Sequence, residues 1–472
     1  MLRNRPWSWR TLALACVAVM VRPAGATGQT TPDDVGRELA SLRRELQALR
    51  TEVESLKAAR TVAAASGPQT EPSADAARGP TLPAPLSAPA PDQPVVTTAS
   101  PQLLAQQIAE LSQVKVESAS RMPVRLFGTL HASAFFNSGE ANWLDNPNIV
   151  AVTPADARAG TFSMGVRQTR LGLSANGPTL GSFRTSGTVV ADFFGGVPGF
   201  QTGQVMGLPR LLVGFARLET SRTAIHIGQD HVVLAPRDPT SLAAFAFPSL
   251  FRSGNLYLRA PQVRIEQALG ARFRAAGALV APIGGDFPGE DYRFVPPALP
   301  GERSRRPAIE GRLAFDSTTD VDAPRLVSVG VSGHHGSERR VGGSAQAWAA
   351  ALDFALRRDR VGVAGEVFRG ENIDAFGGAT GLDARASGGW AELQLFASPR
   401  LSFHGGAGLD ELRGVRSTAL PRRRNRTAYG SVMISLTPEL QASFEYRWLA
   451  TLPGAGRERR NHHVDWVLAY KF

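Results

Sequence analysis

The chain ends in the stretch NHHVDWVLAYKF, residues 461–472, in which large apolar and polar side chains alternate. Val464, Trp466, Leu468, Tyr470 and Phe472 fall on one face of this stretch. The intervening positions include a histidine and two charged side chains, so the two faces differ in polarity. A period of two residues predicts a β-strand whose faces meet different surroundings. A soluble β-sandwich strand can alternate in this way, but so long a run with an aromatic end favours another kind of sheet.

The same alternation recurs along the chain back to residue 123. In the preceding segment Tyr446 and Trp448 share one face and Arg447 lies on the other. The sequence therefore predicts an all-β protein built from a large antiparallel sheet. We count sixteen alternating segments, which are residues 124–136, 162–176, 182–194, 209–219, 222–230, 255–268, 271–281, 307–315, 324–334, 346–356, 361–369, 386–396, 401–411, 424–436, 440–449 and 461–472.

The connections between these segments differ in length in a regular way. Those after even-numbered segments are mostly short, such as residues 220–221 and 437–439. Those after odd-numbered segments are longer and include residues 137–161, 231–254 and 282–306. Short turns at one rim, long loops at the other and an even strand number are typical of outer-membrane barrels. The sequence thus predicts a transmembrane antiparallel β-barrel over residues 123–472.

The polarity of the two faces fits a sheet in lipid. Because hydrocarbon offers no hydrogen-bond partner, a sheet that spans a membrane has to close on itself. An arginine on the lipid face near the midplane costs about 2–4 kcal/mol. We therefore expect arginines of the alternating segments to point into the barrel, among them Arg264, Arg274, Arg312 and Arg447.

The hairpin around Gly270 offers a pairing that keeps both faces consistent. With a three-residue loop that ends at this glycine, Glu266 pairs with Arg272. Arg264 then pairs with Arg274 further along the same two strands. A two-residue loop would mismatch the faces, because directly opposed residues share a face.

The N-terminal residues 1–26 read as a secretory signal peptide. Arg3, Arg5 and Arg10 precede an apolar run at 11–21, and a small-residue cleavage site follows at 24–26. A membrane anchor is a weaker alternative, because the run is too short to span a bilayer. A lipoprotein is another alternative, since a cysteine lies within the run, but the usual large aliphatic residue three positions earlier is absent.

Residues 31–60 carry the pattern of a coiled coil. Apolar side chains alternate four and three positions apart, and glutamates and basic residues flank the seam at complementary positions. One amphipathic helix on a surface is the alternative, but the flanking charges favour self-association with the number of helices left open. The seam consists of Val35, Leu39, Leu42, Leu46, Leu49, Val53 and Leu56. Residues 61–122 are rich in proline and alanine, which predicts a semi-extended linker.

Composition and motifs exclude several classes of protein. With 472 residues, 43% apolar, and no apolar run of about 18 residues, the chain is neither disordered nor a helical membrane protein. Cys16 is the only cysteine, which excludes a disulfide framework and a cysteine-ligated metal. The adjacent histidines at 334–335 and at 462–463 point to opposite faces of a strand, so we expect no metal. No catalytic motif or cofactor fingerprint is found, and we expect no enzyme and no cofactor.

The net charge of +11 would suit nucleic-acid binding, but the export signal and the dispersed arginines argue against it. A TonB-type transporter would need a globular plug before the barrel, where this chain has a heptad helix and a linker.

Several short motifs together resemble the DcaP-like trimeric outer-membrane porins. They are Met164 followed by Gln168-Thr169-Arg170-Leu171-Gly172, then Asp192-Phe193-Phe194-Gly195-Gly196, Gly228-Gln229-Asp230 and Pro239-Thr240-Ser241-Leu242. The resemblance implies a sixteen-stranded barrel, a homotrimer, a third external loop folded into the lumen and passive uptake of small anions such as dicarboxylates. Two features depart from it: tyrosine is scarce, and His231 stands where an aromatic residue is expected.

The sequence thus predicts an outer-membrane porin of a Gram-negative-type cell, a passive diffusion channel for small anions, with the coiled coil in the periplasm. Its partners would be outer-membrane lipid and lipopolysaccharide, two further copies of itself and peptidoglycan, but no nucleic acid. The rival hypothesis is a structural envelope protein that tethers the outer membrane to peptidoglycan through its coiled coil. Each pore arginine could also be neutralised by an acid and merely stiffen the wall. The candidate pore residues are Arg170, Asp192, Arg237, Arg252, Arg264, Glu266, Arg272 and Arg274.

Overall fold

A computed structural model describes residues 124–472, except 153–158, 197–206, 283–297, 319, 321–322, 341–342, 379–383 and 414–421. The expected signal peptide, coiled coil and linker lie outside the described residues. Self-association through the seven seam residues therefore stays a prediction.

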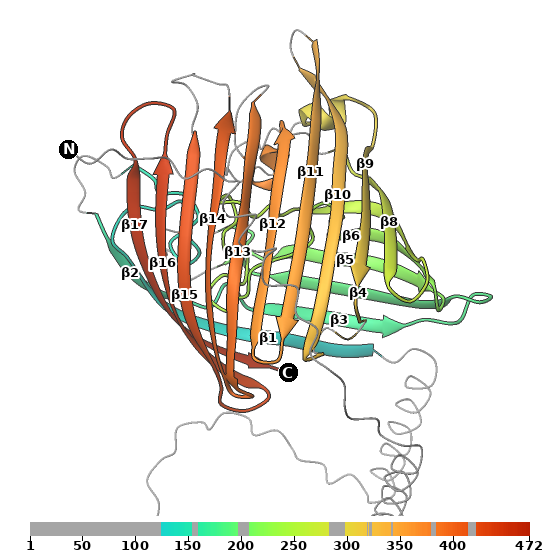
Figure 1. Ribbon diagram of the computed structural model, residues 1–472, viewed down its shortest axis with the longest axis horizontal. Helices are drawn as coiled ribbons and strands as arrows, with labels where there is room; N and C mark the ends of the chain where they lie inside the picture. Colours follow the sequence, from blue (N-terminus) through green and yellow to red (C-terminus); the bar gives the residue numbers. More distant parts are fainter. Residues whose placement is uncertain are drawn as a thin grey trace, which may run out of the picture. The chain divides into compact units, whose positions relative to one another are not determined.

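The described chain forms a single antiparallel sheet that closes into a barrel (Figure 1). The closure is made by β1, which pairs with β17, while β9 pairs with β10. The strands are β1 Val124–Asn137, β2 Thr161–Gly165, β3 Arg170–Asn176, β4 Arg184–Asp192, β5 Arg210–Glu219, β6 Thr223–His231, β7 Arg259–Ala268, β8 Phe273–Val280, β9 Ala308–Asp316, β10 Arg325–Arg340, β11 Gly343–Arg358, β12 Val361–Glu371, β13 Arg385–Ser398, β14 Leu401–Arg413, β15 Arg424–Ser435, β16 Leu440–Leu452 and β17 Arg459–Lys471. Two short helices are α4 Pro300–Arg303 and η1 Asp374–Phe376.

The predicted number of sixteen strands is confirmed, although seventeen segments are labelled. Both β2 and β3 pair with the same neighbour, β1, one beside each half of its length. They are two halves of one barrel strand, which the sequence predicts as the continuous segment 162–176. The interruption at residues 166–169 arises because two polar side chains there, Arg167 and Gln168, leave the ladder to bind loops inside the barrel.

The short turns and long loops lie at opposite rims, as the connection lengths predict. Residues 220–222 and 436–439 form tight turns, whereas residues 138–160, 232–258 and 281–307 form long connections. The predicted loop at residues 335–345 is wrong. Between β10 and β11 the ladder continues to the pair Arg340 and Gly343, so that these strands project beyond their neighbours (Figure 1).

The two faces of the barrel have the polarity of a sheet in lipid. Trp466, Leu468 and Tyr470 point outward and are about half exposed, whereas Asp353 and Glu445 point inward and are completely buried. This arrangement reverses the pattern of a soluble protein, because the apolar side chains face outward and the charged ones inward. No helix among the described residues is long and apolar enough to cross a membrane.

The inward orientation expected for four arginines agrees with their contacts. Arg264 and Arg312 bind carboxylates inside the barrel, Arg447 binds Glu445, and Arg274 lines an internal cavity. The predicted pairing of the hairpin around Gly270 is wrong, however.

In that hairpin Arg264 lies opposite Ala278 and Arg274 lies opposite Ala268. The pairing continues to Leu269, whose N–H donates to the carbonyl of Phe273, and Gly270 with its φ of 93° begins the turn rather than ending it. The turn therefore falls two residues later than predicted. Because the error is an even number of residues, every side chain keeps its predicted face.

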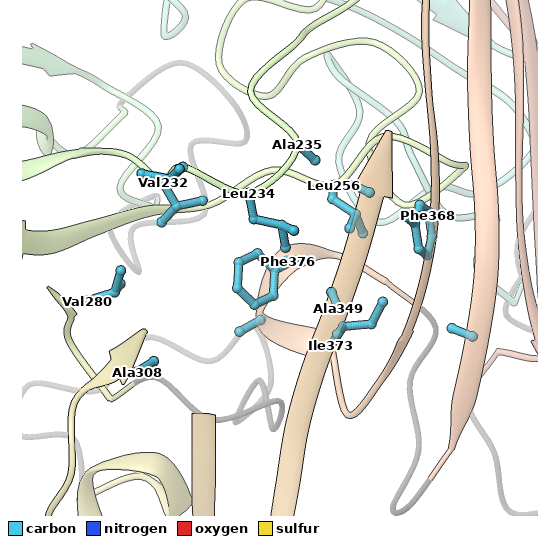
Figure 2. Packing of buried hydrophobic residues seen from close by; sticks show 14 of the residues in the cluster. Val232, Leu234, Ala235, Leu256, Val280, Ala308, Ala349, Phe368, Ile373 and Phe376 are labelled. Carbon is cyan, nitrogen blue, oxygen red and sulfur yellow. The ribbon is translucent and has the colours of Figure 1, made fainter. Parts of the chain in front are cut away.

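The apolar core lies inside the barrel, between the wall and the third long loop, which is residues 232–258 between β6 and β7. Val232 and Leu234 of this loop pack against Phe376 of η1 and against wall residues such as Ala308 and Ala349 (Figure 2). The third loop thus folds into the lumen, as the resemblance to DcaP-like porins implies.

Candidate functional site

The wall that faces the third loop carries a row of buried carboxylates. Glu310, Asp353, Glu366, Glu392 and Glu445 come from β9, β11, β12, β13 and β16, and each is at most 3% exposed. A carboxylate buried in this way has to be paired with donors or cations, because its desolvation is otherwise too costly.

The third loop supplies those donors, largely from its backbone. The loop crosses the inner face of the wall from β9 to β16 and donates hydrogen bonds to an acid on most of the strands that it passes. At the start of the loop, the N–H groups of Val233 and Leu234 donate to Glu310 at 2.6 and 3.1 Å. Further along, the N–H of Arg237 donates to Glu366 at 2.7 Å, and the N–H of Thr240 donates to Glu392 at 3.0 Å. The Oγ of Ser241 then donates to Glu445 at 2.6 Å. The negative charge of this wall is therefore covered by the loop.

Arg237, a predicted pore residue, belongs to this anchoring system. Its Nε donates to Asp353 at 2.6 Å and its Nη2 to Ser328 at 2.5 Å. Asp353 also accepts hydrogen bonds from the Nε and Nη2 of Arg312, so one fully buried carboxylate holds two guanidiniums. Arg237 ties the loop to the wall through this acid, and not through its sequence neighbour Asp238.

The opposite wall presents guanidiniums to the lumen. The side chain of Arg170 lies over the ring of Phe245 at 4.0 Å and donates to the carbonyl of that residue. Its Nε has no hydrogen-bond partner, and no described carboxylate forms a salt bridge with it. Asp192 lies opposite Arg170 in the strand register but binds Arg210 instead, through two hydrogen bonds of 3.1 and 2.7 Å.

Arg259 and Arg252 extend the cationic surface toward the long-loop rim. Arg259 donates to the hydroxyl of Tyr257 at 2.6 Å and lies 3.6 Å from Asp230. The guanidinium of Arg252 lies 5.5 Å from the ring of Trp143. The chain turns back toward the wall just after Arg252, at Gly254.

Only glycine fits at Gly254. Its φ is 107°, and a Cβ there would lie 2.1 Å from the carbonyl oxygen of Gly389. The close approach of the loop to β13 is thus built into this residue.

Arg264, Glu266 and Arg274 lie together further toward the short-turn rim. Arg264 contacts Asp230 at 3.1 Å and Glu266 at 3.0 Å, while Arg274 lies 3.6 Å from Asp316. Arg272, the last of the candidate pore residues, lies in the turn between β7 and β8, where it is exposed and outside the wall.

Three cavities between the third loop and the arginine wall have volumes of about 230, 440 and 180 Å³. The first is lined by three arginines and one acid, the second by two arginines and a lysine without an acid, and the third by three arginines and one acid. Arg259 lines both the first and the second cavity. Basic side chains therefore outnumber acids around each of these spaces.

Comparison with known proteins supports the fold. The chain matches no protein-family model and no curated protein sequence. Among solved structures, it is similar to the outer-membrane channel DcaP of Acinetobacter baumannii, with a TM-score of 0.58 and 14% identity over 75% of this chain and 98% of that one. It is also similar to an anion-selective porin from Comamonas acidovorans, with a TM-score of 0.50 and 14% identity over 75% of this chain and 100% of that one.

This chain has the DcaP-type porin fold. The resemblance that the short motifs indicate is confirmed at the level of the barrel and its strand number. One motif residue also has a clear role within this porin fold. The side-chain Oε1 of Gln168 accepts hydrogen bonds from the N–H groups of Phe245 and Ala246, each at 2.9 Å. The interrupted strand therefore holds the far end of the third loop.

Sequence reasoning misses two lumen arginines of the porin fold because strict alternation fails near them. A β-bulge opposite Val190 and Ala191 reverses the faces at the start of β5, which turns Arg210 inward. By alternation, Arg259 would lie on the same outward face as Val263. Its side chain nevertheless reaches Tyr257 inside the barrel, because Arg259 is the first residue of β7. A search for arginines at strand ends beside long loops would have found both.

Proposed function

We propose that this protein is an outer-membrane porin, a passive diffusion channel for small anionic solutes. The porin fold and the apolar outer face support a channel that spans the outer membrane. The observation that carries the anionic preference is the excess of basic side chains around all three cavities, while the acids of the opposite wall are bound by the loop.

The physical basis of the preference is the field in a narrow, low-dielectric passage. Basic side chains that line a pore raise the local concentration of anions and lower that of cations. Arg170 is the strongest contributor in this proposal, because no described carboxylate forms a salt bridge with it, and it lines the largest of the three cavities. Arg259 lines the same cavity, and Tyr257 and Asp230 hold its guanidinium in place.

Small dicarboxylates are the proposed solutes. The resemblance to DcaP-like porins implies this class, and neighbouring guanidiniums such as Arg170 and Arg259 offer separate donors to two carboxylate groups. We further propose that the protein is a homotrimer in the outer membrane, with residues 31–60 as a coiled coil in the periplasm.

Reversal potentials of the purified full chain in planar bilayers under a salt gradient test this function. The unmodified protein should prefer anions. Arg170→Gln should lower the ratio of anion to cation permeability about five- to sixfold, because one unit charge about 8 Å away at the dielectric constant of water changes the energies of an anion and a cation by about 0.5 kcal/mol in opposite directions. Arg272→Gln in the turn is the matched control and should leave the ratio unchanged.

Two results would oppose the proposal. Cation preference of the unmodified protein would contradict the anionic solute class. Absence of any conductance from correctly folded barrels would favour the rival role, a structural tether between the outer membrane and peptidoglycan.

A further inference from the structure

The outward face of β15, β16 and β17 changes character toward the long-loop rim. Phe444 and Trp466 lie opposite each other within the apolar band. At the loop-side end of the same strands, Arg426, Ala450 and Arg460 form one row across the three strands. The small side chain of Ala450 separates two guanidiniums that point to the outside of the barrel.

The depth of this row places it at the membrane surface. His462 in β17 and Phe472 just after its end are ten residues apart. At about 3.4 Å per residue and a strand tilt of about 40°, ten residues span about 26 Å along the membrane normal. This distance is close to the height of the apolar band in such barrels. Arg460 lies two residues beyond His462 and therefore at the level of lipid headgroups. Below Arg426, the ring of Trp448 lies 5.6 Å from its guanidinium, and tryptophan is typical of this interfacial level.

A third arginine completes the cluster around one acid. Glu458 contacts Arg426 at 2.6 Å, Arg424 at 3.3 Å and Arg460 at 3.5 Å. Glu411 lies further away, 3.8 Å from Arg424. Three guanidiniums thus share two carboxylates, and only one of the carboxylates lies close to all three.

The cluster has more donors than these acids can accept. Each guanidinium carries five N–H groups, and the Nε atoms of Arg424 and Arg426 are buried without a hydrogen-bond partner. Burial raises the pKa of Glu458, but hydrogen bonds from Arg426 and Arg424 outweigh that effect and hold the pKa below its ordinary value. Glu458 therefore stays ionised at neutral pH, and the cluster keeps a net positive charge.

We propose that Arg424, Arg426 and Arg460 bind a phosphate group of lipopolysaccharide in the outer leaflet. Phosphate accepts several hydrogen bonds from guanidiniums and matches a cluster with unused donors and a positive charge. Lipopolysaccharide is the occupant because the cluster lies at the long-loop rim, which faces the outside of the cell in an outer-membrane barrel. This inference concerns the outer face of the barrel and does not depend on which solute passes through the pore.

Native mass spectrometry of the full-length protein in detergent, with diphosphoryl lipid A as the probe, tests the site. The unmodified protein should retain bound lipid A, and Arg426→Gln/Arg460→Gln should weaken binding at least about tenfold, the loss of one charged hydrogen bond of about 1.5–3 kcal/mol or more. Arg385→Gln/Arg413→Gln removes two outward arginines from the same rim of β13 and β14 and serves as the matched control. The anion conductance of both variants should equal that of the unmodified protein, because none of these residues lines the pore.

A second variant keeps the proposal testable if the double variant folds poorly. Glu458→Gln should strengthen binding of lipid A, since it removes the carboxylate that competes with phosphate for the three arginines. Equal binding by the unmodified protein and Arg426→Gln/Arg460→Gln would overturn the site, as would weaker binding by Glu458→Gln. If phosphatidylglycerol binds as strongly as lipid A, the cluster takes phospholipid headgroups and the assignment to lipopolysaccharide is wrong.

Discussion

The two inner walls of this barrel use their charged residues in different ways. From β9 to β16 the carboxylates are buried and bind the third loop, for example Glu366 with the N–H of Arg237. From β3 to β7 the arginines border open space, and Arg170 has no described carboxylate partner. The number of acids in the wall is therefore a poor guide to the charge that a solute meets. Anchoring a loop with acids leaves the arginines of the opposite wall to determine the field in the passage.

The largest expected effect comes from breaking the carboxylate wall at the buried ion pair of Glu445 and Arg447. Glu445→Leu leaves Arg447, which is 2% exposed, without its partner, and an unpaired buried charge costs about 3–5 kcal/mol. The temperature at which the folded barrel loses its compact migration in detergent electrophoresis should fall. In the control Glu445→Leu/Arg447→Leu both charges are removed, and most of the loss should be recovered. A single variant as heat-resistant as the unmodified protein would contradict the role of this pair.

A smaller effect, in conductance rather than stability, distinguishes an anchoring arginine from a pore arginine. Arg237→Ala removes a hydrogen bond to the buried Asp353, worth about 1.5–3 kcal/mol, while Arg312 still neutralises that acid. The third loop should loosen, so single-channel conductance should rise and become noisier, with little change in anion preference. If anion preference falls as much as in Arg170→Gln, the distinction between the two walls is wrong.

The smallest effect concerns the arginines that already have acidic partners. Arg264→Ala/Arg274→Ala should shift the reversal potential toward neutrality by a factor of about two in permeability ratio, because Arg274 is half exposed and screened by solvent. The shift should shrink as the salt concentration rises, since mobile ions screen exposed charges first. A shift that is independent of salt would indicate that the change acts through the shape of the pore.

The sequence predicts local features of this barrel better than long-range ones. Alternation defines the strands and gives the correct face of Arg264 and Arg447, because each face meets one environment along a whole strand. Strict alternation assigns the wrong face to Arg210, because a bulge at Leu212 in its own strand reverses the faces. The partner of Arg237 is 116 residues away at Asp353, and no local pattern specifies a contact between a loop and a wall at such separation.

The interrupted strand has a consequence for the order in which the third loop can assemble. Gln168 lies 77 and 78 residues before the two loop N–H groups that it accepts, whereas Glu445 lies 204 residues after its partner Ser241. Contacts between residues nearer in sequence close smaller chain loops and form earlier. The loop can therefore dock on the first strands of the barrel before the last strands exist. The strands from β9 to β16 then pair beside a loop that is already docked. Their carboxylates accept hydrogen bonds from successive residues of the loop and fix its position on the wall.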